Sequence, residues 1–339
     1  MSLSSAAHSG LMFRRFSFLF CLTLLAAGTG SAQTSLFYLE AQGVAGYSSS
    51  LDKWVAYSLH QDDVMQKPGL GFDYVQRFSR ETGDFAVLAV QARLAWNADG
   101  GKKLEPQLYN AYLKFKFPGV DFWVGHNRPA FGLSSTFDVH AQILPTLVMY
   151  GYGYDRDWGL GLGRDFSRGS WGLSLTTGSG MVLRLKDGYL LSGRLSLGVL
   201  GRDNWTAGLS AAAGEALETM GYTLMSPDPM PFRMAGVDIT HTRNNLENRF
   251  EAAVGRKFGK DAWAVFWRLG INLLGEERLK WEVQPLFMRE EGQGSLHLGT
   301  GLSFLATGDL TVRVMVAYDR KARDSRAVLQ IYYYKRIIF

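Results

Sequence analysis

Cysteine is nearly absent from this sequence. The one cysteine among the 339 residues, Cys21, lies close to the N-terminus. With a single thiol the chain forms no internal disulfide, and beyond residue 32 it has no thiolate for catalysis or metal binding. Disulfide-rich scaffolds and thiol enzymes are therefore excluded.

Long apolar runs are missing after residue 32, where no stretch reaches the 18 or so residues of a membrane-spanning helix. Before it, the apolar stretch Phe16–Ala27 has 12 residues, follows Arg14-Arg15 and precedes Gly30-Ser31-Ala32. A basic segment, a short apolar segment and small residues make a secretory signal peptide. We expect residues 1–32 to be cleaved and residues 33–339 to be the exported protein.

An excess of either charge is missing too. After residue 32, 34 Lys and Arg stand against 31 Asp and Glu, so no nucleic-acid partner is expected. The histidines of this part are scattered without metal-ligand spacing, and neither G-x-S-x-G nor H-E-x-x-H occurs. We expect no cofactor, no metal and no enzymatic activity.

Glycine and aromatic residues are abundant, whereas proline is scarce. Much of the chain alternates between apolar and polar residues, so that one face is apolar and the other carries polar groups and glycine. This alternation is clear in "FYLEAQGVAGY" (37–47), "FAVLAVQARLAWN" (85–97), "AWAVFWRLGINLL" (262–274) and "LTVRVMVAYD" (310–319). A period of two residues predicts β-strands with two different faces.

Short turns and longer connections alternate along the chain. The short turns are at 80–84, 118–119, 167–169, 200–204, 243–245, 274–278 and 306–309. The other connections are at 48–69, 97–107, 128–157, 178–188, 214–232, 259–261, 289–294 and 320–326. Together they join 16 strands and place both chain ends on the side of the short turns. The spacing leaves room for the 9–11 residues that a tilted strand needs to cross a bilayer.

Aromatic residues stand at the expected strand ends. One set flanks the short turns: Phe78, Phe85, Phe117, Phe166, Trp171, Trp205 and Phe304. A second set lies at the other ends: Tyr47, Trp96, Tyr109, Trp158, Trp263 and Tyr318. A secreted sandwich or propeller also has alternating strands, but two aromatic rings are typical of outer-membrane barrels. We predict an all-β, antiparallel, up-and-down transmembrane barrel of about 16 strands in the outer membrane of a Gram-negative type cell, in contact with its lipids.

The last strand, "QIYYYKRIIF" (330–339), is apolar at alternate positions up to the final residue. An unpaired sheet edge in lipid costs several kcal/mol per bare amide, so this strand should pair with the first one. Tyr333, Ile337 and Phe339 resemble the C-terminal assembly signal of bacterial outer-membrane barrels, which implies recognition by the barrel-insertion machinery. Lys335 departs from that pattern on the lipid side.

Residues 109–133, "YNAYLKFKFPGVDFWVGHNRPAFGL", resemble the phosphate-selective porin family of 16-stranded barrels. In that family a similar strand, turn and strand lead into the third external loop, and in porins the third loop folds inward and narrows the barrel. The resemblance implies this role for residues 128–157, with Arg128, Phe131, Asp138 and His140 as constriction candidates. Alternatively, Tyr150, Tyr152 and Tyr154 prolong the following strand.

The face turned to the barrel interior should carry the function. Alternation assigns inward nine cations and seven anions, which favours a water-filled channel for small hydrophilic solutes with at most a mild anion preference. The cations are Arg77, Arg93, Lys114, Lys116, Arg194, Lys257, Arg268, Lys280 and Arg313. The anions are Glu40, Asp73, Asp121, Asp238, Glu251, Glu282 and Asp319.

Two other functions stay open at this point. One is a scaffolding barrel that encloses an electron carrier or an exported protein. The other is an outer-membrane hydrolase, which would need a Ser/His or Asp/His group at one level of the barrel. Small lipid-facing residues at Ala41, Gly43 and Ala45 are consistent with contacts between copies in a homotrimer.

Overall fold

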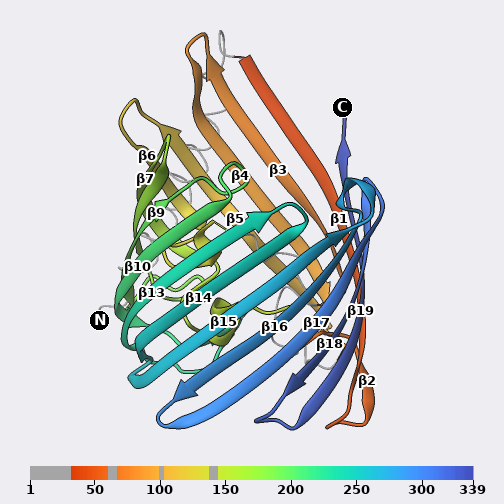
Figure 1. The fold of residues 1–339 in the computed structure, drawn as a ribbon. Coiled ribbons are helices and arrows are strands. Elements are labelled where there is room, and N and C mark those ends of the chain that lie inside the picture. Colours follow the sequence, from red (N-terminus) through yellow and green to blue (C-terminus); the bar gives the residue numbers. More distant parts are fainter. Residues whose placement is uncertain (1–31, 60–66, 99–102, 137–143, 339) are drawn as a thin grey trace, which may run out of the picture.

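The chain forms one closed sheet. A computed structural model describes residues 32–59, 67–98, 103–136 and 144–338. Its wall is a barrel of 16 antiparallel strands (Figure 1). The strands are β1 (Ala32–Ser48), β3 (Gly69–Arg80), β4 (Gly83–Trp96), β5 (Leu104–Lys116), β6 (Asp121–Asn127), β7 (Asp157–Phe166), β8 (Gly169–Thr176), β9 (Tyr189–Leu197), β10 (Trp205–Ala216), β13 (Met230–Arg243), β14 (Leu246–Lys257), β15 (Lys260–Leu273), β16 (Leu279–Glu290), β17 (Gln293–Thr307), β18 (Leu310–Asp319) and β19 (Asp324–Ile337).

Shorter elements lie in the connections. They are β2 (Lys53–Val55), which pairs with β1, the hairpin β11 (Thr219–Met220) and β12 (Thr223–Leu224), and the 3₁₀ helices η2 (Leu133–Ser135), η3 (Leu147–Tyr150) and η4 (Gly275–Glu277). Across the part of the chain that the structure describes, no helix is long and apolar enough to cross a membrane.

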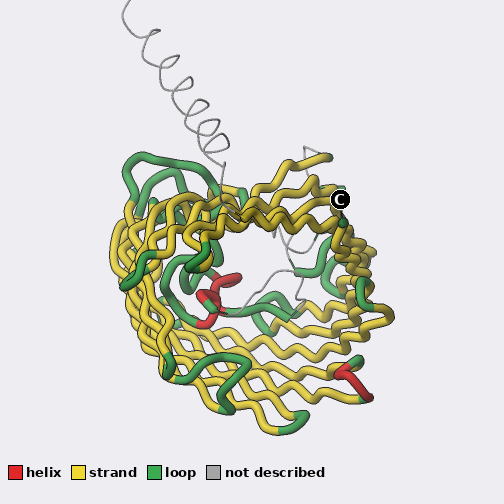
Figure 2. The backbone as a smooth tube through the Cα atoms, turned by 90° about the horizontal axis from the view of Figure 1, so that it is seen from above, coloured by secondary structure: helices red, strands yellow, loops and turns green. Residues whose placement is uncertain are grey.

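The barrel closes where the sequence predicts. β1 pairs with β19 from Phe37↔Ile337 to Ser48↔Arg326, and on its other side it pairs with β3. The ring seen along the axis is therefore continuous (Figure 2). Closure gives every wall strand two neighbours, which is what a sheet in hydrocarbon requires. Ile337 and Tyr333 lie in this seam, whereas Phe339 is outside the described residues, as are residues 1–31 of the expected signal peptide.

The two faces of the wall differ as predicted. On β10, Trp205 and Leu209 are exposed on the outside, whereas Thr206 and Ser210 are buried on the inside. The outward side chains of β9, Leu191, Leu195 and Leu197, are each more than half exposed. Such a continuous apolar surface is stable in lipid and not in water. The apolar face is the outer surface, so these side chains do not form a core.

Lys335 lies on the outer face, close to the turn that joins β17 to β18. Its Nζ is 3.9 Å from Asp309 Oδ2, and about half of the side chain is exposed. A lysine at the end of a strand can extend its ammonium group toward the headgroups. A charged residue is therefore tolerated at position 335, although the C-terminal assembly signal has no charge there.

All seven predicted short turns join consecutive strands at one end of the barrel, and the longer connections lie at the other end. Tyr109 is a correction. A β-bulge pairs Gln91 with Asn110 and Ala92 with Leu108, so Tyr109 is the extra residue. Instead of joining the outer aromatic ring, it is buried, and its hydroxyl donates to Asp155 Oδ2 at 2.5 Å.

Candidate functional site

The connection between β6 and β7 spans residues 128–156, and its described parts, 128–136 and 144–156, lie inside the barrel (Figure 2). We call it the third loop. It includes η2 and η3, while residues 137–143 within it are outside the described residues. The wall contacts the described parts of the third loop through a surface of small residues and through three attachments, which use polar groups that alternation turns inward.

The inner face of β7 to β10 is built from small residues. Gly161, Gly163, Gly172, Ser174 and Ser210 take inward positions. A side chain at Gly172 would come within 3.3 Å of Ala130 Cβ. The serine hydroxyls accept backbone hydrogen bonds from the loop, from Ala130 N to Ser174 Oγ at 2.9 Å and from Gly132 N to Ser210 Oγ at 3.2 Å. The small side chains on this part of the wall thus allow the loop backbone to pack closely against it.

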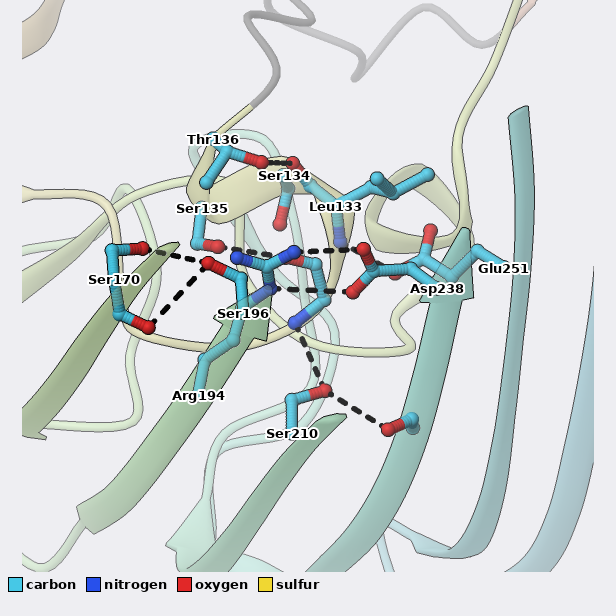
Figure 3. Close-up of polar contacts among 12 residues, drawn as sticks. Leu133, Ser134, Ser135, Thr136, Ser170, Arg194, Ser196, Ser210, Asp238 and Glu251 are labelled. Carbon is cyan, nitrogen blue, oxygen red and sulfur yellow. Dashed lines mark hydrogen bonds and ion pairs between the residues drawn. The ribbon is translucent and has the colours of Figure 1, made fainter. Parts of the chain in front are cut away.

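The first attachment is a charge cluster at the start of η2 (Figure 3). Leu133 N donates to Glu251 Oε1 at 2.9 Å. Glu251 pairs in register with Asp238, whose carboxylate receives two hydrogen bonds from Arg194 at 2.7 and 3.2 Å. Gly132 has φ +64°, and a Cβ there would lie 2.2 Å from Glu251 Oε1, so only glycine fits this approach.

The second attachment clamps the carbonyls of Leu144 and Pro145. Arg268 Nη2 donates to them at 2.9 and 3.2 Å, and Gln284 Nε2 donates to Pro145 O at 2.6 Å. Arg268 Nε also donates to Gln284 Oε1 at 2.7 Å. The Leu144 side chain fills the space above Gly299, where a Cβ would lie 2.6 Å from Leu144 Cδ2. The buried guanidinium of Arg268 therefore binds the loop backbone to the wall.

The third attachment lies near the end of the barrel that carries the longer connections. Lys257 Nζ donates to Tyr150 O at 3.1 Å and pairs with Glu290 at 2.7 Å. The Tyr152 hydroxyl donates to Trp263 O, and the Tyr154 hydroxyl to Leu217 O at 2.6 Å. Burial raises the pKa of Tyr154, so its hydroxyl stays a donor. Because β7 begins only at Asp157, these tyrosines hold the loop and do not prolong that strand.

An apolar cluster reinforces these polar contacts. Phe131, Leu133 and Leu147 of the loop are at most 3% exposed and pack with wall residues that include Phe232 and Phe266. Phe131 therefore contributes its ring to the packing of the loop. Arg128 is half-buried at the start of the loop, and Asp138 and His140 are outside the described residues.

The charges assigned inward fall into two groups. Glu40, Arg93, Arg194, Asp238, Glu251, Lys257 and Arg268 are buried. Arg93 pairs with Glu40 at 3.4 Å. Glu251, Lys257 and Arg268 bind the third loop, and Arg194 binds Asp238 next to Glu251. The other group keeps partly or fully exposed side chains: Asp73, Arg77, Lys114, Lys116, Asp121, Lys280, Glu282, Arg313 and Asp319. Within it, Lys114 and Asp121 form an ion pair at 2.8 Å.

Alternation alone does not identify which wall side chains form hydrogen bonds with the backbone of the third loop. Ser174, Ser210 and Gln284 were not among the predicted site residues, although each bonds the third loop. The signal that could have found the two serines is the run of Gly, Ser and Thr at inward positions on four consecutive strands, β7 to β10. Gln284 lies on β16, outside that run.

In the described ranges no group of three or more His, Cys, Asp or Glu residues could hold a metal ion. His297 does have neighbours that the sequence does not reveal, Ser295 Oγ at 2.9 Å from Nε2 and Asp319 Oδ2 at 3.5 Å from Nδ1. The Tyr150 hydroxyl lies 3.3 Å from the same Nδ1, and the two rings pack at 4.7 Å, so His297 supports the third loop.

No family model matches the chain, and no curated protein is similar to it in sequence. Solved structures are similar in fold. In vitro folded OmpT, an outer membrane protein of Vibrio cholerae in trimer form, is 11% identical with a TM-score of 0.62, covering 90% of this chain and 100% of its own. OmpF of Salmonella typhi in complex with daunomycin is 11% identical with a TM-score of 0.63, covering 90% and 98%. A mutant of the Rh. blastica porin is 12% identical with a TM-score of 0.56, covering 90% and 100%.

These similarities concern the fold, which is that of bacterial outer-membrane porins. A closed barrel of 16 strands with an apolar outer surface is a multi-pass barrel of the Gram-negative outer membrane.

Proposed function

We propose that the chain is an outer-membrane porin, a water-filled channel for the passive diffusion of small hydrophilic solutes. The observation that carries this proposal is the third loop. It is held against the inner wall by Glu251, Arg268 and Lys257, so it narrows the lumen from one side. A loop attached in this way sets a fixed cross-section, which a diffusion channel needs to sort solutes by size.

A mild preference for anions is part of this proposal. Of the nine inward cations, four are buried, and of the seven inward anions, Glu40, Asp238 and Glu251 are buried. Five cations and four anions remain to face the solute. Their fields reach about 8 Å at physiological ionic strength. This near balance supports weak selectivity, and the resemblance of residues 109–133 to phosphate-selective porins favours the anion side.

The experiment is conductance of the refolded protein in a planar bilayer under a salt gradient. We expect stable open-channel steps and a reversal potential slightly on the anion side. A protein that inserts but gives no steps would exclude the channel, and a reversal potential on the cation side would exclude the anion preference. A sheath around a partner protein would instead give closed barrels that co-purify with a stoichiometric partner.

Two further properties belong to the proposal. The flat outer surface at Ala41, Gly43 and Ala45 supports contact between copies in a homotrimer, the form in which the Vibrio cholerae OmpT was solved. Its test is the mass of the detergent-solubilised protein. Removal of residues 1–32 on export is tested by sequencing the N-terminus of the protein isolated from the outer membrane.

A further inference from the structure

Two adjoining cavities lie on the inner wall beside η2, with volumes of about 250 and 330 Å³. Thr136, Asp165, Ser170 and Arg194 line both of them. Since a water molecule takes up about 30 Å³ in the liquid, each cavity has space on the order of ten waters. That is the size of a small organic solute and well above that of a single ion.

Hydroxyl groups line the larger cavity. They come from four elements: Thr136 of the third loop, Ser170 of β8, Ser196 of β9 and Thr206 of β10. The Ser170 and Ser196 hydroxyls lie 2.7 Å apart (Figure 3). A hydroxyl group both donates and accepts hydrogen bonds, so this lining can bond to a solute hydroxyl that acts as a donor or as an acceptor.

The cations of the larger cavity offer little attraction for an anion. Arg194 also lines the cavities, but Asp238 takes a two-point hydrogen bond from it, and Glu251 adds a second carboxylate behind that pair. In the smaller cavity the ammonium of Lys114 is paired with Asp121 at 2.8 Å. Arg128 and Arg164 also line this smaller cavity, and Asp165 lines both cavities. In the larger cavity the second cation, Arg202, is paired with Asp203 at 3.1 Å. In the larger cavity, which carries the hydroxyl groups, an anion would therefore meet only cations that are already paired.

We propose that these two cavities form a binding subsite for a neutral polyhydroxylated solute, such as a monosaccharide or a sugar alcohol. The inference rests on the proposed channel and names the class of solute that its wall retains. Sugar hydroxyls can hydrogen-bond to Thr136, Ser170 and Ser196 in place of solvent, at little cost in enthalpy. Arg194 lines the same side of both cavities and is held in place by Asp238 behind it. One wall of the subsite is the third loop, so the Glu251 attachment also fixes the subsite.

The test is ion current through single channels with increasing glucose, divided at each step by the conductivity of the bulk solution. In the native protein we expect this normalised current to fall and saturate. In the double variant Ser170→Ala, Ser196→Ala we expect it to stay constant. The matched control is Ser303→Ala, an inward serine on β17 away from these cavities, which should behave as the native protein does.

A normalised current that does not respond to glucose in the native protein would overturn the subsite, and so would an equal response in the double variant. Saturation by phosphate but not by glucose would overturn it in favour of an anion site. If no channel forms, calorimetric titration of glucose into the refolded, detergent-solubilised barrel still tests the subsite. Failure of the channel and failure of the subsite are therefore separate results.

Discussion

The Glu251 attachment allows a quantitative prediction. Glu251→Ala removes the carboxylate that accepts the Leu133 N–H at 2.9 Å. A hydrogen bond to a charged group is worth about 1.5–3 kcal/mol in a protein. At about 1.4 kcal/mol per factor of ten, the detached form of this part of the loop should become roughly 10 to 140 times more populated. The barrel itself should remain intact, because the wall hydrogen bonds of β14 are not altered.

The assay is single-channel recording of the refolded variant. We expect added open-channel noise and extra conductance levels, since Arg268 and Lys257 still hold the rest of the loop. Glu251→Gln is the matched control, because its amide oxygen can still accept the Leu133 N–H, and its effect should be clearly smaller. Currents of Glu251→Ala that cannot be told from the native currents would refute the reasoning, as would equal effects of the two variants.

Two other substitutions follow from the same geometry. Arg268→Lys keeps the charge but cannot bridge Leu144 O, Pro145 O and Gln284 at once, so its open-channel noise should rise as much as that of Arg268→Gln. A change of reversal potential in Arg268→Gln alone would mean that Arg268 acts as a pore charge. Leu302 and Ser303 face opposite sides of β17, so Leu302→Arg should destabilise the lipid-embedded barrel by about 2–4 kcal/mol and Ser303→Arg by much less, as measured by urea unfolding in liposomes. Equal effects would contradict the assignment of the faces.

Much of the wall could be predicted from the sequence because the two faces of each strand lie in different solvents. Lipid and water impose a period of two on every strand, and this period is local information. The turns at 80–84 and 306–309 are equally local, since short polar segments with glycine separate two alternating runs. Even the pairing of β1 with β19 follows from one general condition, that a sheet in lipid has no open edge.

Local pattern does not determine what lies against the inner face. The bulge at Tyr109 changes which residues of β5 point inward, and no glycine or other turn residue in the sequence indicates its position. A second register shift, between Leu305 and Thr307, brings His297 opposite Asp319. Pairing counted from the turn without that shift would place the neighbouring residue, Arg320, there instead. Contacts of the third loop depend on such shifts along several strands together.

The inward charges show why counting them overstates the charge that a solute meets. Burying an ion without a partner costs several kcal/mol, so a charge that the loop covers must be paired or hydrogen-bonded. Arg194 meets this condition with Asp238, Glu251 with the Leu133 N–H, and Arg268 with two carbonyls. A residue that alternation assigns to the lumen is therefore either a partner of the loop or a neighbour of the solute, and the path of the loop decides which. Alternation therefore shows which residues point into the barrel, but it does not show which of them line the open passage beside the loop.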